Sequence, residues 1–133
     1  GANVLILLSY QNNIEFKKTI LISPFNQMNS IFKGFQNIVK FPNSLYNKMI
    51  DLAEERIDIQ LRDLEFGELG NQTSLNEVLL MHVKGDKITP VSHSESMNQQ
   101  WEKLKFIPIE GSGHYKILWN KEVIQNAVDF TSN

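Results

Sequence analysis

Three short apolar runs, separated by segments of helical periodicity, leave few architectures open to this chain. The runs cover about residues 18–23, 78–83 and 104–109. Each run is short enough for a buried strand and is bounded by polar, glycine or proline residues. Strands that alternate with helices require crossover connections, which favour a parallel sheet. The pattern therefore predicts the α/β class, with three parallel strands and flanking helices.

The remaining segments are predicted to be helical or loop-like. Helices are expected at about 2–10, 28–39, 45–56, 93–103 and 121–131. Two of them carry start signals, because Ser92 and Glu95 have the spacing of a capping box and Asn120 is a good N-cap residue. Residues 63–76 contain two glycines and little periodicity, so they are predicted to be the loosest part of the chain. Pro108 predicts that the last strand lies at an edge or contains a bulge, since proline donates no ladder hydrogen bond.

Composition excludes several classes of function. With 133 residues the chain is long enough for one compact domain. Thirteen basic and fifteen acidic side chains leave no basic stripe for phosphates, so we expect no nucleic-acid partner. The absence of cysteine excludes disulfides and thiolate chemistry, and it favours a cytoplasmic location. The first apolar run, Val4–Leu8, is too short for a signal peptide or a membrane span, so no membrane partner is expected.

Two polar loops leave the carboxyl ends of neighbouring predicted strands. Asp86 lies in the first loop, and His114 lies in the second, within the stretch EGSGHYKIL. Ligands gather at the carboxyl ends of parallel strands, where a carboxylate and an imidazole would form the orienting half of a nucleophilic triad. Two other interpretations stay open at this point. Asp86 and His114 could be ordinary loop residues, with Asp86 making an Asx turn, or they could bind a metal together with His82.

The segment VLLMHVKGDKITPVSHSE, followed by a strand and IEGSGHYKIL, resembles the last third of an α/β-hydrolase. Members of that superfamily carry H-D-x-x-D-x-x-V/I-P after the seventh strand and E-G-x-G-H after the eighth. The resemblance places Asp86 on the triad acid and His114 on the triad base. We expect no cofactor, and no metal because the chain has no H-x-x-x-H or H-E-x-x-H pattern. His82, which starts the first motif, is interpreted as a packing and hydrogen-bonding residue.

The resemblance extends over residues 1–133, as the C-terminal portion of a single α/β-hydrolase domain with a cap-like helical insertion at about 25–76. Gly1 matches the last glycine of the nucleophile elbow G-x-S-x-G, so the serine is expected two residues before Gly1. No such pentapeptide occurs in the chain. Ser92 and Ser94 are interpreted as residues of a helix start, and Ser112 as a loop residue.

We therefore expect the chain to be a fragment that is inactive alone. Its intact parent is expected to be a serine carboxylester hydrolase that acts on a small ester-like substrate. The alternative is a non-catalytic protein of the same fold that binds a ligand or a partner. In either case the strand at 18–23 would lack a neighbouring strand on one of its two sides. Its edge is expected to pair with the missing N-terminal half or to make an oligomer.

Other aromatic and histidine residues are interpreted more simply. His93 is expected to be exposed, whereas Trp101, Phe106 and Trp119 are expected in the core. For the phenylalanines of the insertion, an acyl-binding pocket and a cover over the sheet remain equally open. These are Phe25, Phe32, Phe35 and Phe41.

Overall fold

The computed structural model of the protein describes residues 1–132, apart from the side chain of Ser112. The chain forms two compact units. One contains the residues up to Asn26 and those from Phe66 onward, and the other is Gln27–Glu65. The second unit lies within the range of the insertion predicted at about 25–76, and the residues from Phe66 onward group with the first unit.

The first unit is built on a parallel sheet of three strands in the order β1-β2-β3. The strands are β1 (Phe16–Ile22), β2 (Leu75–Gly85) and β3 (Leu104–Ser112). This arrangement confirms the predicted α/β class and the three parallel strands. Each strand also continues into polar residues that the apolar pattern could not detect, since backbone pairing does not require an apolar side chain. Pro108 lies in β3, at an edge of the described sheet, as predicted.

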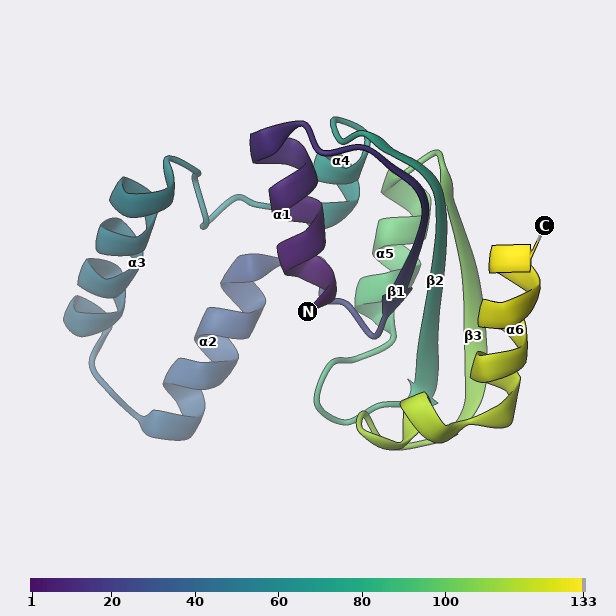
Figure 1. Cartoon of the computed structure of the whole chain (residues 1–133). Helices are drawn as coiled ribbons and strands as arrows, with labels where there is room; N and C mark the ends of the chain where they lie inside the picture. The colour runs from purple at the N-terminus through teal and green to yellow at the C-terminus, as the bar shows by residue number, and fades with distance from the viewer. Residues whose placement is uncertain (133) are drawn as a thin grey trace. The chain divides into compact units, whose positions relative to one another are not determined.

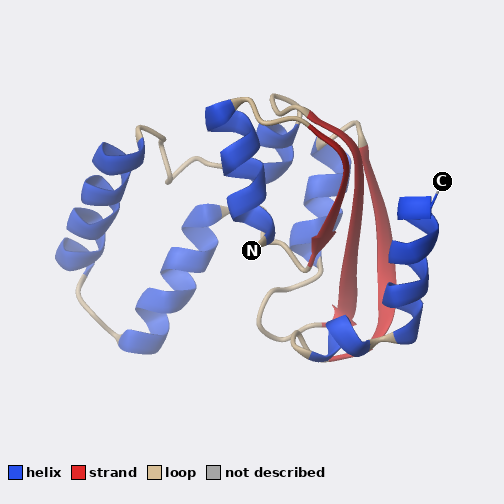
Figure 2. Ribbon diagram, in the orientation of Figure 1, coloured by secondary structure: helices blue, strands red, loops and turns tan. Residues whose placement is uncertain are grey.

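Helices cover both faces of this sheet (Figure 1, Figure 2). One face carries α1 (Ala2–Asn12), α4 (Phe66–Gly70) and α5 (Ser92–Gln100), and the other carries α6 (Lys121–Ser132). The central strand β2 is buried through most of its length, as expected for a parallel strand with helices on both sides. None of the helices in residues 1–132 is both long and apolar enough to cross a membrane.

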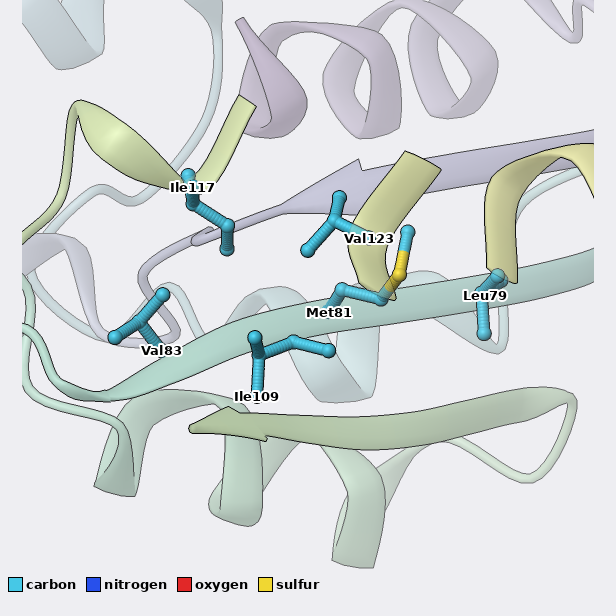
Figure 3. Packing of buried hydrophobic residues seen from close by; sticks show 6 residues of the cluster. All are labelled: Leu79, Met81, Val83, Ile109, Ile117 and Val123. Atoms are coloured by element: carbon cyan, nitrogen blue, oxygen red, sulfur yellow. The ribbon is translucent and has the colours of Figure 1, made fainter. Parts of the chain in front are cut away.

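Successive side chains of β2 point to opposite faces of the sheet. Leu79, Met81 and Val83 form a buried cluster with residues of β3, α6 and the short 3₁₀ helix η1 (Lys116–Trp119), as Figure 3 shows. Side chains at the alternating positions point to the opposite face. His82 therefore lies on the side of α5, where its ring is hydrogen-bonded to Ser94.

The prediction that residues 63–76 are loose was wrong. They contain α4, whose Phe66 and Leu69 are buried, and the start of β2. A Cβ atom on Gly70 would lie 2.2 Å from the ring of Trp101. Glycine is therefore present here because two elements pack closely, which a sequence pattern cannot distinguish from flexibility.

The second unit is a helical pair, α2 (Met28–Val39) and α3 (Asn43–Ile57), and α2 has the predicted bounds. Within it a small pocket of about 130 Å³ is lined mainly by aromatic and apolar side chains. The lining residues are Phe32, Phe35, Phe41, Tyr46, Met49, Ile50 and Ala53. Three of the four phenylalanines in question thus contribute to a pocket of the helical pair, whereas Phe25 packs edge-on against Phe66 in the first unit.

One of the two predicted helix caps is present. The side chain of Asn120 accepts a hydrogen bond of 2.8 Å from the backbone N–H of Glu122, as an N-cap does. The capping box of Ser92 was wrong, because α5 starts at Ser92 after Val91 and has no side-chain cap hydrogen bond. The chain enters α5 directly from the loop that contains Asp86, and Ser94 bonds to His82 instead.

Candidate active site

Asp86 and His114 come together at the carboxyl ends of β2 and β3. The Nδ1–H of His114 donates to Oδ2 of Asp86 over 2.6 Å, which is short for an N–H···O hydrogen bond, and bonds to charged groups are shorter than neutral ones. The side chain of Asp86 is fully buried, whereas that of His114 is 26% exposed. The structure thus brings together a buried carboxylate and a partly exposed imidazole, the two residues that the sequence predicts to meet.

The path of the backbone explains how His114 reaches the acid. β2 and β3 pair regularly up to Val83 and Ile109, and the register then shifts before Gly85 pairs with Ser112. Gly111 and Gly113 have φ angles of 130° and 96°, which side chains rarely allow. The glycine pair therefore lets the chain turn sharply enough for the imidazole to face Asp86. The side chain of Ser112, between the two glycines, lies outside the described part of the structure.

Both carboxylate oxygens of Asp86 are hydrogen-bonded. Oδ1 accepts from the backbone N–H groups of Ile88 (2.9 Å) and Thr89 (3.0 Å), which is an Asx turn, while Oδ2 accepts from His114. Burial by itself raises the pKa of Asp86, but the hydrogen bonds from Thr89, His114 and Ile88 outweigh it and leave the pKa below its usual value. The carboxylate is therefore ionised at neutral pH. The Asx turn expected for a loop aspartate and the contact expected for a triad acid are thus both present.

A second histidine lies behind the acid. His82 is fully buried, its Nε2 is 3.2 Å from Oδ2 of Asp86 and 2.9 Å from the carbonyl oxygen of Thr89, and its Nδ1 is 2.6 Å from Oγ of Ser94. Burial lowers the pKa of His82 against the opposing effect of the hydrogen bond to Thr89 and the charge of Asp86. The sequence predicts a packing and hydrogen-bonding role for His82, which these contacts agree with, but it does not identify Ser94 as a partner.

His114 also lines a pocket of about 500 Å³. Since Nδ1 is bound to Asp86, Nε2 is the ring nitrogen left for a reacting group. The lining comes from the start of α1, the end of β1 and the segment around η1. Its residues are Gly1, Ala2, Asn3, Ile20, Ile22, Ser23, Phe25, Thr89, His114, Tyr115, Ile117 and Leu118.

Ser23 is a pocket residue that the sequence did not single out. It follows β1 with a φ angle of 44°, and its Oγ is buried without a hydrogen-bond partner. A polar residue at the carboxyl end of a strand was the available signal, but Ser23 had been assigned to the strand itself. In the part of the chain that the structure describes, no hydroxyl is hydrogen-bonded to His114.

Two tryptophans, a phenylalanine and a histidine differ in how deeply they are buried. Trp101 is buried as predicted and Phe106 is half-buried, but the prediction for Trp119 was wrong, since η1 leaves this side chain 79% exposed. His93 was expected to be exposed and is half-buried, with its Nδ1 accepting a hydrogen bond from the backbone of Asn26. Among residues 1–132, no group of three or more metal-binding side chains has the arrangement to hold an ion.

No family model and no curated protein sequence matches the chain. Solved structures do match it over its whole length. An α/β-hydrolase enzyme from a Medee basin deep-sea metagenome library matches 100% of this chain and 62% of its own, with a TM-score of 0.65 and 12% identity. A hydrolase from Pseudomonas aeruginosa matches 100% of this chain and 62% of its own, with a TM-score of 0.66 and 13% identity. An esterase from Exiguobacterium antarcticum matches 100% of this chain and 64% of its own, with a TM-score of 0.61 and 19% identity.

The chain therefore spans less than two thirds of the length of these matched structures. The structural agreement extends over all of this chain, at identities that bear on the fold alone. From the sheet, its flanking helices and these matches, we conclude that the chain has part of the α/β-hydrolase fold.

Proposed function

We propose that this chain supplies the acid and the base of a Ser-His-Asp triad in a serine carboxylester hydrolase. The observation that carries the proposal is the 2.6 Å hydrogen bond between Asp86 and His114, where His114 lines a pocket. Asp86 holds the His114 tautomer that has its hydrogen on Nδ1, so Nε2 is free to accept a proton from a nucleophile. After the attack the same nitrogen gives that proton to the leaving group.

The nucleophile in this proposal is a serine two residues before Gly1. Gly1 and Ala2 line the same pocket as His114, so chain entering α1 from that side would approach the imidazole. An elbow between a strand and a helix is the usual way to expose a serine at this edge of an α/β sheet. Residues 1–133 contain no such elbow, and we expect them to be inactive as a separate polypeptide.

The pocket supports an ester with an apolar group as the substrate. Ile20, Ile22, Phe25, Ile117 and Leu118 line it, and His114 is its titratable group with a proton-accepting ring nitrogen. Apolar lining with a few polar groups is typical of sites for small uncharged ligands. A charged acyl group would lose its hydration there without gaining an opposite charge.

The test starts from the residue two positions before Gly1 in the gene. If it is serine, the polypeptide that includes it is assayed on short p-nitrophenyl esters, with His114→Ala as the test variant and His93→Gln as the control. We expect His114→Ala to lower kcat by at least about a thousandfold and His93→Gln to leave it unchanged. Equal rates for His114→Ala and the unchanged protein would contradict the proposal. A glycine or alanine at the upstream position would favour a binding protein of this fold.

We also propose that the free edge of β1 pairs with a strand from outside the described residues. β1 is the edge strand next to β2, and it has an apolar second half, Ile20–Ile22. Such an edge exposes unpaired backbone groups and recruits another strand. Because the matched structures are longer than this chain, the intended partner in our proposal is the rest of the same fold, and a second copy takes its place when that part is absent.

A further inference from the structure

His82 is placed where a neutral ring can act on the acid. The carbonyl oxygen of Thr89 can only accept, and the ionised Oδ2 of Asp86 can only accept as well. The hydrogen of the His82 ring is therefore on Nε2, facing both oxygens at 2.9 Å and 3.2 Å. Nδ1 is then an acceptor, and the Oγ–H of Ser94 donates to it over 2.6 Å.

These contacts close a ring of hydrogen bonds around the acid loop. The N–H of Thr89 donates to Oδ1 of Asp86, the carbonyl oxygen of Thr89 accepts from His82, and His82 also donates to Oδ2 of Asp86. His82 thus contacts both the carboxylate and the backbone that holds it. Oδ2 is the same oxygen that accepts from His114.

We propose that His82 is a positioning residue for Asp86, held in orientation by Ser94, so that Oδ2 of the acid faces Nδ1 of His114. The proposal rests on the proposed function only in taking His114 as the base. Because burial keeps the ring of His82 neutral by lowering its pKa, the contact orients the carboxylate without cancelling its negative charge. That charge is what stabilises the imidazolium that His114 becomes during the reaction.

A pair of substitutions separates positioning from packing. In His82→Gln the side-chain amide can still donate to both Asp86 and Thr89, whereas His82→Leu keeps an apolar side chain in the core and removes both hydrogen bonds. His93→Gln is the matched control, since His93 lies next to Ser94 in α5 and its Nδ1 accepts from the backbone of Asn26.

The measurement is the NMR resonance of the proton on Nδ1 of His114, which reports on the hydrogen bond to Asp86. We expect His82→Leu to move this proton upfield and to make its exchange with water at least about tenfold faster. His82→Gln should restore most of the original shift, and His93→Gln should leave it unchanged. In a form that hydrolyses esters, His82→Leu should lower kcat and leave KM unchanged.

A folded His82→Leu variant with an unchanged His114 proton would overturn the proposal. If His82→Leu does not fold, Ser94→Ala decides the question, because it keeps His82 and removes the donor to its Nδ1. We expect Ser94→Ala to shift the His114 proton in the same direction by a smaller amount, and an unchanged proton there would also overturn the proposal. The resonance needs no substrate, so failure of ester hydrolysis and failure of this proposal are distinguishable.

Discussion

At the scale of single residues, Asp86 shows how one side chain can hold a turn and also orient a neighbouring ring. One carboxylate oxygen holds the loop through Ile88 and Thr89, and the other accepts from His114 and His82. Oδ1 therefore fixes the loop, and Oδ2 contacts the two imidazole rings. The hydrogen bonds that form the Asx turn are also the ones that keep the pKa of Asp86 low, together with that from His114.

The buried neutral ring of His82 predicts that stability depends on pH. The pKa of His82 is lowered from 6.5 in the folded protein, mainly by burial, so below 6.5 the unfolded chain binds a proton at this position that the folded chain does not. Stability therefore falls as the pH falls through this range. Between about pH 7.5 and about pH 5, the free energy of unfolding should fall in the unchanged protein and should fall less in His82→Gln. The difference between the two decreases should be up to about 2 kcal/mol.

Urea unfolding at the two pH values measures this difference. His93, whose pKa is also lowered by burial, contributes in the same direction to both proteins and largely cancels in the comparison. Parallel losses of stability in the two proteins would contradict the prediction.

At the scale of elements, close packing decides positions that look permissive in the sequence. α4 lies against α5 so tightly that Gly70 faces the ring of Trp101, just after α5, with no room for a Cβ atom. In α2, by contrast, nothing lies within 4 Å of the position that a Cβ on Gly34 would occupy. A side chain therefore has no space at Gly70, whereas it has open space at Gly34.

Replacing each of these glycines by alanine tests that difference. Gly70→Ala should lower the free energy of unfolding by about 1–3 kcal/mol, because the new methyl group overlaps a buried ring. Gly34→Ala should raise helix stability by about 0.5–1 kcal/mol, because alanine has the higher helix propensity. Urea unfolding followed by circular dichroism measures both. Equal effects of the two substitutions would show that the packing against Trp101 is not tight.

At the scale of the whole molecule, the described sheet ends on a strand whose outer edge has no neighbour among residues 1–132. The helices lie on the two faces of the sheet (Figure 2), and β1 and β3 are its outer strands among the described residues. A parallel sheet of this kind is normally continued or covered at such an edge.

The free edge predicts how residues 1–133 behave when produced as a separate polypeptide. We expect light scattering after size exclusion to show a dimer or a larger species whose share grows with protein concentration, because β1 pairs with a second copy. A monomer at all concentrations would contradict the proposed pairing. In our proposal, a polypeptide that supplies the N-terminal part of the fold competes for the same edge, so adding it should give a complex with one copy of each part.

The sequence by itself determined the sheet and the pairing of Asp86 with His114. Apolar runs of strand length located β1, β2 and β3, and parallel strands place their carboxyl-end loops at one edge, which brought Asp86 and His114 together. Only the tertiary structure decided the contact of His82 with Ser94, the close approach of Gly70 to Trp101 and the exposure of Trp119. Periodicity reports which face of an element is apolar, whereas these three features depend on how separate elements meet.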